Sequence, residues 1–353
     1  MNAVDGRPTG TPELGPTDSI IDVPGVRVGQ VAIGPTEEAP GGSTGVTAVV
    51  TSDGALGAVD VRGAAPATRE TDALSAVASG ERVHAIVLAG RSVFGLAAAD
   101  GATDELEARG VGLPVERPDG RLTIPIVAGA AIFDFAHGDR AVRPGPADGR
   151  AAIATALDGD ATQRPQSGNV GAGTGATTGS IADPRLKGGV GNASAVLPLA
   201  DQPALMVGAL AVLNSAGSLV DPGSGKPWAQ WGGFHVDATA PDFSAIAAAR
   251  RNTTLVVVAT NARLDKAQLA RVAAMAHDGL ARAIRPAHTS VDGDVVFALG
   301  LREAEGRPAV AVHEWAAAGV TVVGSLAADA VTRAVLDALV SARSSGGFRA
   351  YRS

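Results

Sequence analysis

The sequence contains no cysteine among its 353 residues. This absence excludes disulfides, thiolate nucleophiles and cysteine-ligated metal sites, and it leaves no marker of the redox compartment. Aromatic residues make up only 3% of the chain, whereas glycine occurs 46 times. We therefore expect a core of Ala, Val, Leu and Ile in which glycines let backbone segments approach one another closely.

Basic charge is also scarce, since 29 Lys and Arg face 36 Asp and Glu for a formal net charge of −7. A nucleic-acid partner is not expected, because binding a polyanion requires a basic face. No apolar run approaches the length of a membrane span, and the polar start of the chain lacks the apolar segment of a secretory signal. The sequence thus predicts a cytoplasmic protein with no membrane partner.

Strand-like and helix-like patterns alternate along most of the chain. Residues 1–18 are rich in Gly, Pro and Thr and are predicted to form a flexible tail. Helices are expected over 68–79, 96–110 and 325–343, a strand over 253–260, a helix from Asp265 with Gln268 as its capping partner, and a hairpin over 294–315. Because the two patterns alternate without segregating, residues 19–353 are predicted to form one mixed α and β domain.

The chain has a glycine-rich stretch with Gly171, Gly173 and Gly175 at alternate positions. It does not end in Gly-Lys-Ser/Thr, and it lacks the strand, helix and later acid of a dinucleotide fingerprint. Nucleotide binding is therefore not expected, and no cofactor is predicted. The glycines are expected either to permit close backbone approach or to line a substrate cleft with their amides.

The six histidines form no HxH or HExxH pair, so no metal site is predicted. The chain also lacks the Gly-x-Ser-x-Gly elbow of many serine hydrolases. His277 and His288 are interpreted as structural histidines rather than as catalytic bases.

Two carboxylates, Asp292 and Asp294, stand two residues apart in "HTSVDGDVVFAL". In a strand this spacing places both side chains on one face, where each shifts the pKa of the other. The alternative is an Asp-Gly turn, which is common and which the spacing alone favours.

The stretch "RRNTTLVVVAT" raises a similar choice at Thr253. One interpretation is that a strand begins here, because Thr is common in strands. The sharper hypothesis is that the chain cleaves its own Asn252–Thr253 bond and exposes Thr253 as an N-terminus. Such a Thr holds a nucleophilic hydroxyl and a base in one residue, because a free α-amine has a pKa near 7.7–8.0.

As a set, the motifs closely resemble the P1 peptidase family, which includes L-aminopeptidase/D-esterases, β-peptidyl aminopeptidases and nylon-oligomer hydrolases. The resemblance runs in order over residues 20 to 340. It rests on "DVPGVRVGQ", "VDVRGAAPATRETD", "HAIVLAGRSVFGLAAADG", "IPIVAGAAIFDF", "GNVGAGTGATTG", "KGGVGNAS", "NTTLVVVATNARL" and "HDGLARAIRPAHTSVDGDVVFAL".

The resemblance implies an α+β fold, a four-layer αββα sandwich of the N-terminal-nucleophile type that is shared with ornithine acetyltransferases. It further implies autocleavage into an α-chain, 1–252, and a β-chain, 253–353, that remain associated. This heterodimer would assemble into a homo-oligomer, with a tetramer expected.

The resemblance also assigns roles to single residues. Thr253 is placed at the family's nucleophile, Asn214 at its oxyanion donor and Lys187 at a lysine of the nylon-oligomer branch. Asp292 and Asp294 fall on the pair that assists the nucleophile, which reverses the preference for a turn. Substrate binding is assigned to Phe133, which replaces a family Tyr, together with the glycine-rich stretch.

The sequence therefore predicts an autoprocessing N-terminal-threonine amidohydrolase or aminopeptidase. Its substrates would be small peptides, amino-acid amides or esters, or ω-amino-acid oligomers, cleaved through an acyl-enzyme on Thr253. The alternatives are an acyltransferase of the ornithine acetyltransferase type and a non-catalytic binding protein in which Thr253 is only a strand residue.

Overall fold

The computed structural model describes residues 8–35, 42–80, 82–118, 120–181, 185–200, 202–229, 252–303, 306–315 and 317–353. Its helices are α1 (Ala98–Ala108), α2 (Pro146–Asp158), α3 (Lys266–Ala283) and α4 (Ala317–Ser341). Its strands are β1 (Glu13–Leu14), β2 (Arg27–Ile33), β3 (Thr44–Val61), β4 (Thr68–Arg69), β5 (Val83–Ala89), β6 (Leu113–Arg117), β7 (Gly120–Ile124), β8 (Val127–Ala131), β9 (Thr177–Thr178), β10 (Leu186–Lys187), β11 (Gly189–Leu197), β12 (Leu205–Leu213), β13 (Leu255–Thr260) and β14 (Val295–Gly300).

The long strand β3 joins two sheets. Its first part pairs with β2 and β5, and its last part pairs with β14. The pairing register shifts between Val50 and Ala55, where β3 passes from one sheet to the other. One sheet has the order β1-β11-β12-β13-β14-β3, and the other continues β3-β5-β8-β4 with β2 on the other side of β3.

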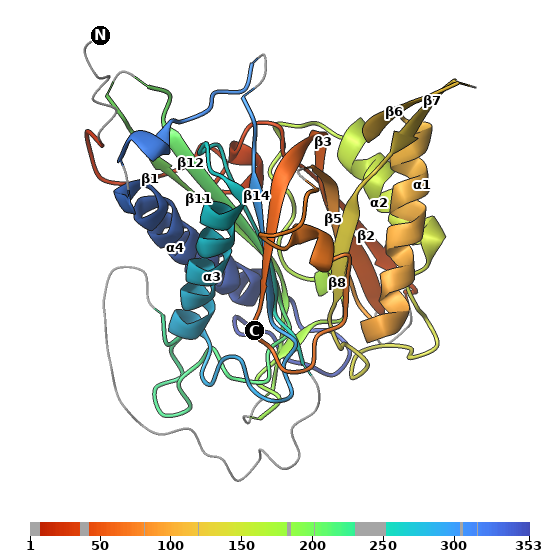
Figure 1. The fold of residues 1–353 in the computed structure, drawn as a ribbon. Coiled ribbons are helices and arrows are strands. Elements are labelled where there is room, and N and C mark those ends of the chain that lie inside the picture. The colour runs from red at the N-terminus through yellow and green to blue at the C-terminus, as the bar shows by residue number, and fades with distance from the viewer. Residues whose placement is uncertain are drawn as a thin grey trace.

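Helices cover the outer faces of both sheets, as Figure 1 shows with α3 and α4 on one side and α1 and α2 on the other. Alternate residues of β13 explain the layering. Val256 and Val258 belong to the core beneath α3 and α4, whereas Leu255 and Val257 belong to the core between the sheets. A third core lies beneath α1 and α2. The predicted four-layer αββα sandwich is therefore confirmed.

Glycines lie where helices α1 and α2 contact each other. A Cβ on Gly101 would lie 1.7 Å from the carbonyl oxygen of Pro146, and a Cβ on Gly149 would lie 1.7 Å from that of Ala98. Only glycine permits this approach of α1 to α2, because any side chain would overlap backbone atoms. The scarcity of aromatic residues thus reflects close backbone packing.

The local predictions had mixed outcomes. The helix from Asp265 is confirmed, with the Asp265 carboxylate accepting from Gln268 N at 2.8 Å and the Gln268 side chain accepting from Asp265 N at 2.9 Å. The expected helices over 96–110 and 325–343 correspond to α1 and α4, although α4 begins earlier. Helix α2 was not predicted.

Two expectations were wrong, and a third, the flexibility of the tail, stays a prediction. Residues 68–79 contain β4 and a short 3-10 helix rather than an α-helix. The segment after β14 forms no hairpin, because Val310 pairs with Ala262, beyond β13. Of the predicted tail, residues 1–7 lie outside the described residues, while β1 within 8–18 pairs with β11.

Helix α4 contains the span Ala318–Ser341, which among the described helices is alone in being long and apolar enough to cross a membrane by length and composition. The apolar character has a structural reason in this fold, because α4 packs against β11, β12 and α3. Of its most apolar window, 56% is buried inside the protein.

Candidate active site

The candidate site forms where three strands bring their ends together. Parallel strands β13 and β14 begin at the same edge, so Thr253 and Asp292 precede neighbouring strands. Antiparallel β12 ends at that edge, so Asn214 lies beside the start of β13. Thr253 N donates to the carbonyl oxygen of Asn214 at 2.7 Å, and Gly293 N donates to that of Asn252 at 3.0 Å. Residues that are far apart in sequence therefore meet around one peptide bond.

The Asn252–Thr253 bond is buried and held on both sides. Asn252 and Thr253 are 1% and 3% exposed. The Asn252 side chain accepts from Ser180 Oγ at 2.7 Å and donates to Asn214 O at 3.2 Å. Thr253 Oγ1 donates to the carbonyl oxygen of Asn252. The hydroxyl thus lies against the carbonyl that it would attack.

Only glycine fits at position 293 without a steric overlap. A Cβ built on it would lie 2.8 Å from Thr253 Oγ1 and 2.6 Å from the carbonyl oxygen of Ala65. The absence of a side chain lets the Asp292–Asp294 segment pass directly beside the Thr253 hydroxyl.

Asn214 has fixed partners on both atoms of its amide. Its Oδ1 accepts from Thr177 N at 3.0 Å, and its Nδ2 donates to the carbonyl oxygen of Phe133 at 3.2 Å. The amide nitrogen carries two N–H donors, and this contact uses one of them. The half-buried Phe133 ring meets Phe135 edge-on, with centroids 5.0 Å apart.

The two carboxylates have different partners. Asp292 accepts from Ala216 N at 3.0 Å and from the Thr289 hydroxyl. Asp294 accepts from Thr254 N at 2.7 Å and lies 2.8 Å from His288 Nδ1. Burial, and then the neighbouring charge of Asp294, raise the pKa of Asp292 to about 6.

Lys187 is fully buried and donates to three backbone carbonyls. Its Nζ lies 3.1 Å from the oxygen of Gly173, 2.8 Å from that of Ala176 and 3.0 Å from that of Gly188. Burial lowers the pKa of Lys187 to about 7, against the attraction of Asp134. These contacts fix the glycine-rich segment whose Thr177 amide holds Asn214.

Gly173 and Gly175 lie in close backbone contacts. A Cβ on Gly173 would be 2.4 Å from Val190 N, and a Cβ on Gly175 would be 2.3 Å from Asp134 Oδ2. The Gly173 amide donates to Val170 O at 2.9 Å. The structure thus supplies the packing reason for both glycines, and their role in substrate binding stays a prediction.

Sequence reasoning missed several polar residues next to the site. Arg91 and Asp134 form an ion pair of 3.5 Å with both side chains fully buried. His288 was interpreted as structural, yet its ring nitrogen contacts Asp294. A lone Asp within "AAIFDF" and a His six residues before Asp294 were the available signals.

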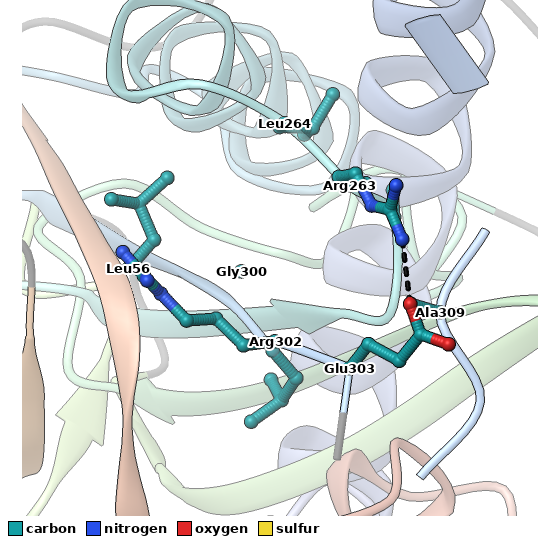
Figure 2. Close-up of a pocket in the computed structure, with 9 residues that line it drawn as sticks. Leu56, Arg263, Leu264, Gly300, Arg302, Glu303 and Ala309 are labelled. Atoms are coloured by element: carbon teal, nitrogen blue, oxygen red, sulfur yellow. Dashed lines mark hydrogen bonds and ion pairs between the residues drawn. The ribbon is translucent and has the colours of Figure 1, made fainter. Parts of the chain in front are cut away.

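A cleft lies at the opposite ends of β13 and β14, away from the candidate site. This cleft of about 260 Å³ is lined by residues that follow the two strands and by Leu56 and Ala309. Figure 2 shows the ion pair between Arg263 and Glu303 at its rim, 2.6 Å long. None of the predicted site residues lines it.

Within the described ranges, no group of three or more His, Asp or Glu side chains is placed to hold a metal ion. The prediction that neither metal nor cofactor is needed stays a prediction.

Comparisons with known proteins agree on the family. The model of Peptidase family S58 matches residues 18–352. An "Uncharacterized aminopeptidase" of Mycobacterium tuberculosis (strain ATCC 25618 / H37Rv) is 42% identical over 354 residues, covering 95% of this chain and 97% of that protein. The 6-aminohexanoate-oligomer endohydrolase of Paenarthrobacter ureafaciens is 32% identical over 334 residues, covering 90% of this chain and 84% of that protein.

Solved structures show the same fold. The beta-aminopeptidase of Burkholderia sp. has a TM-score of 0.68 at 24% identity, with 98% of this chain and 93% of that chain covered. The L-aminopeptidase D-Ala-esterase/amidase of Ochrobactrum anthropi, described as a variant of the Ntn hydrolase fold, has a TM-score of 0.67 at 23% identity, with 98% and 91% covered. Together with the sequence matches, these likenesses show that the chain belongs to peptidase family S58 and is a peptide-bond hydrolase with an Ntn-hydrolase fold.

Proposed function

We propose that the chain cleaves its own Asn252–Thr253 bond and then uses Thr253 as an N-terminal nucleophile on amide bonds. The observation that carries this proposal is the placement of the Thr253 hydroxyl against the Asn252 carbonyl, whose oxygen also accepts the Gly293 amide at 3.0 Å. A carbonyl with a hydroxyl beside it and an N–H donor on its oxygen is prepared for addition.

In self-cleavage, Thr253 Oγ1 adds to the Asn252 carbonyl carbon while Gly293 N–H stabilises the oxyanion. The carbon–nitrogen bond then breaks, and the proton from the hydroxyl goes to the departing nitrogen. The product is an ester between Asn252 and Thr253 with a free α-amine. Water hydrolyses this ester and leaves the Asn252 carboxylate and the Thr253 hydroxyl.

In turnover, the new α-amine takes the hydroxyl proton as Thr253 attacks the substrate carbonyl. Asn214, with backbone amides, holds the oxyanion. The amine product leaves with a proton, and water then hydrolyses the acyl-enzyme. Hydrolysis without any added amine acceptor would separate this function from acyl transfer.

The fold supports continued association of the two chains after cleavage. Strand β13 of the β-chain pairs with β12 of the α-chain, and β14 pairs with β3. Helices α3 and α4 share a core with β11 and β12. Separation would expose this apolar core and break these strand pairs, so both would hold the two chains together.

The substrate class that we propose is a small peptide or a linear amide, including ω-amino-acid oligomers. It rests on relatives named as aminopeptidases and as a 6-aminohexanoate-oligomer endohydrolase. The tetramer and the cytoplasmic location stay predictions.

Intact mass of the denatured protein tests the proposal, with Thr253→Ala as the comparison. Wild type is expected to give two species, 1–252 and 253–353, and Thr253→Ala only the full-length chain, because alanine has no hydroxyl to attack the carbonyl. Thr253→Ser is the matched control, and it should still cleave because it keeps the hydroxyl. A single full-length species from folded wild type would contradict self-cleavage.

A further inference from the structure

Asp294 is surrounded by N–H donors. Its Oδ1 accepts from Thr254 N at 2.7 Å, and its Oδ2 accepts from the backbone N of His288 at 3.2 Å and from His288 Nδ1 at 2.8 Å. The side chain of Asp294 is only 3% exposed. Two of these partners are backbone amides, which can only donate, and the third, His288 Nδ1, donates when it carries the ring proton; in that tautomer Asp294 acts only as an acceptor.

Asp292 has a more permissive partner. It accepts from the backbone amides of Ala216 at 3.0 Å and Thr289 at 3.3 Å, and it also contacts the Thr289 hydroxyl, which, unlike an amide, can donate or accept. A protonated Asp292 could therefore donate to Thr289, whereas a protonated Asp294 would direct its hydrogen at another donor. The hydrogen-bond partners alone distinguish the two carboxylates.

The backbone of His288 makes its double contact possible. Its φ is 54°, in the left-handed region that non-glycine residues seldom adopt. This conformation directs both the amide and the ring of His288 to one oxygen of Asp294. Left-handed backbone at a non-glycine residue is costly and is often found at functional sites.

A second histidine fixes the surroundings of the first. The rings of His277 and His288 meet edge-on with centroids 4.8 Å apart, and His277 Nε2 lies 3.0 Å from the carbonyl oxygen of Asp60. Among the described residues, His288 Nε2 and His277 Nδ1 have no hydrogen-bond partner. With its proton on Nδ1, a neutral His288 leaves only a lone pair on Nε2, so no buried donor is unpaired.

We infer that His288 is a positioning residue for the carboxylate pair: its Nδ1–H holds Asp294 as an acceptor alongside Thr254 N–H, so that a proton taken up by the pair goes to Asp292. This inference rests on the proposed function for its consequence, because Asp292 would then be the group that exchanges a proton beside Thr253. The contacts themselves do not depend on cleavage.

Among the described residues, few charged or titratable side chains surround His288. On its own segment His288 contacts Asp294, and from α3 it meets His277. Asp60 at the end of β3 and Arg62 just after it lie near His277. Burial lowers the pKa of His277 to about 4, so His277 brings no positive charge near neutral pH. The raised pKa of Asp292, about 6, is consistent with a proton on that residue.

The test compares His288→Asn with His288→Gly in the Thr253→Ala protein, which cannot cleave. Both residues tolerate a positive φ, but only Asn keeps an N–H donor near Nδ1. The measurement is a carboxyl carbon-13 NMR titration from pH 4 to 8, with Asp292→Asn and Asp294→Asn to assign the signals. Thermal unfolding establishes that each variant is folded.

In the parent protein, the change centred near pH 6 should belong to the Asp292 signal. His288→Asn should keep this pattern, whereas His288→Gly should move half or more of the change to the Asp294 signal. A His288→Gly titration like that of the parent, or a His288→Asn titration altered as much as that of His288→Gly, would overturn the inference. Failure of wild type to cleave would refute the proposed function without touching this result.

Discussion

At their starting ends, β13 and β14 are preceded by Thr253 and Asp292, whereas at their far ends they lead into Arg263 and Glu303. The starting end is closed, with Thr253 3% and Asp292 1% exposed. The far end is an open cleft of about 260 Å³ whose Arg263 and Glu303 side chains are 58% and 64% exposed. This cleft thus lies away from the candidate chemistry.

This difference shows that burial with satisfied partners, rather than cavity size, marks the candidate site. Polar groups at the closed end interact in a low-dielectric setting, where hydrogen bonds and charges have large effects. Charges at the far end are screened by water and contribute little. Substitutions at the closed end should therefore have large effects and those at the open end small ones.

The largest effect beyond loss of Thr253 is expected for Asn214→Ala. Removing one oxyanion donor typically costs about 2.7–4 kcal/mol, so turnover of an amide substrate should fall about 10²–10³-fold. Asn214→Asp is the matched control, because it keeps an acceptor for Thr177 N but loses the amide donor. Full turnover in Asn214→Asp would remove Asn214 from the oxyanion site.

Replacing each carboxylate in turn by an amide should show that Asp292 and Asp294 affect stability differently. A pKa raised to about 6 means that the folded state holds a proton more strongly than the unfolded chain, so Asp292 lowers stability as pH rises from about 4 to 6. Asp292→Asn should therefore raise stability at pH 8, by about 1–3 kcal/mol, and should not at pH 4. Asp294→Asn should lower stability at both pH values, because its amide would face N–H donors. Urea unfolding measures both, and equal effects of the two changes would contradict this difference.

A moderate effect is expected for Lys187→Met. Burial lowers the pKa of Lys187 from 10.5 to about 7, so the unfolded chain binds the proton more strongly and wild-type stability should rise with pH between these values. Lys187→Met should lack this rise. Above pH 10.5, where Lys187 is neutral in both states, loss of its N–H donors to the buried carbonyls should lower stability by about 1–3 kcal/mol. A Lys187→Met stability curve parallel to that of wild type would show that burial does not lower the pKa of Lys187.

The smallest effect is expected at the open end. Arg263→Ala removes an exposed ion pair with Glu303, which should change stability by at most about 1 kcal/mol and leave the cleaved fraction unchanged. Glu303→Gln is its matched partner and should behave alike in the same mass and urea measurements. A tenfold loss of cleavage in either variant would mean that the two ends of β13 and β14 are coupled.

Local patterns predicted some elements well and others poorly. The helix from Asp265 and its cap were correct because the capping pair Asp265 and Gln268 lies within one turn. The expected helix over 68–79 failed because Thr68 and Arg69 pair with β8, sixty residues away in sequence. The expected hairpin failed because Val310 pairs with Ala262 and not with β14. Such pairings depend on tertiary contacts that no local window contains.

By itself, the pattern of residues predicted one mixed α and β domain, and the motifs gave a family resemblance that implied the four-layer fold and the candidate residues, because motifs and periodicity lie in neighbouring positions. Only the tertiary structure decided which groups meet: Gly293 N on the carbonyl of Asn252, Asn214 on Thr253 N, and His288 on Asp294. The physical reason is partly strand register, since a shift of one residue in β13 against β12 or β14 would turn the Asn252–Thr253 bond away from Asn214 and Gly293, and partly the left-handed backbone that brings His288 to Asp294.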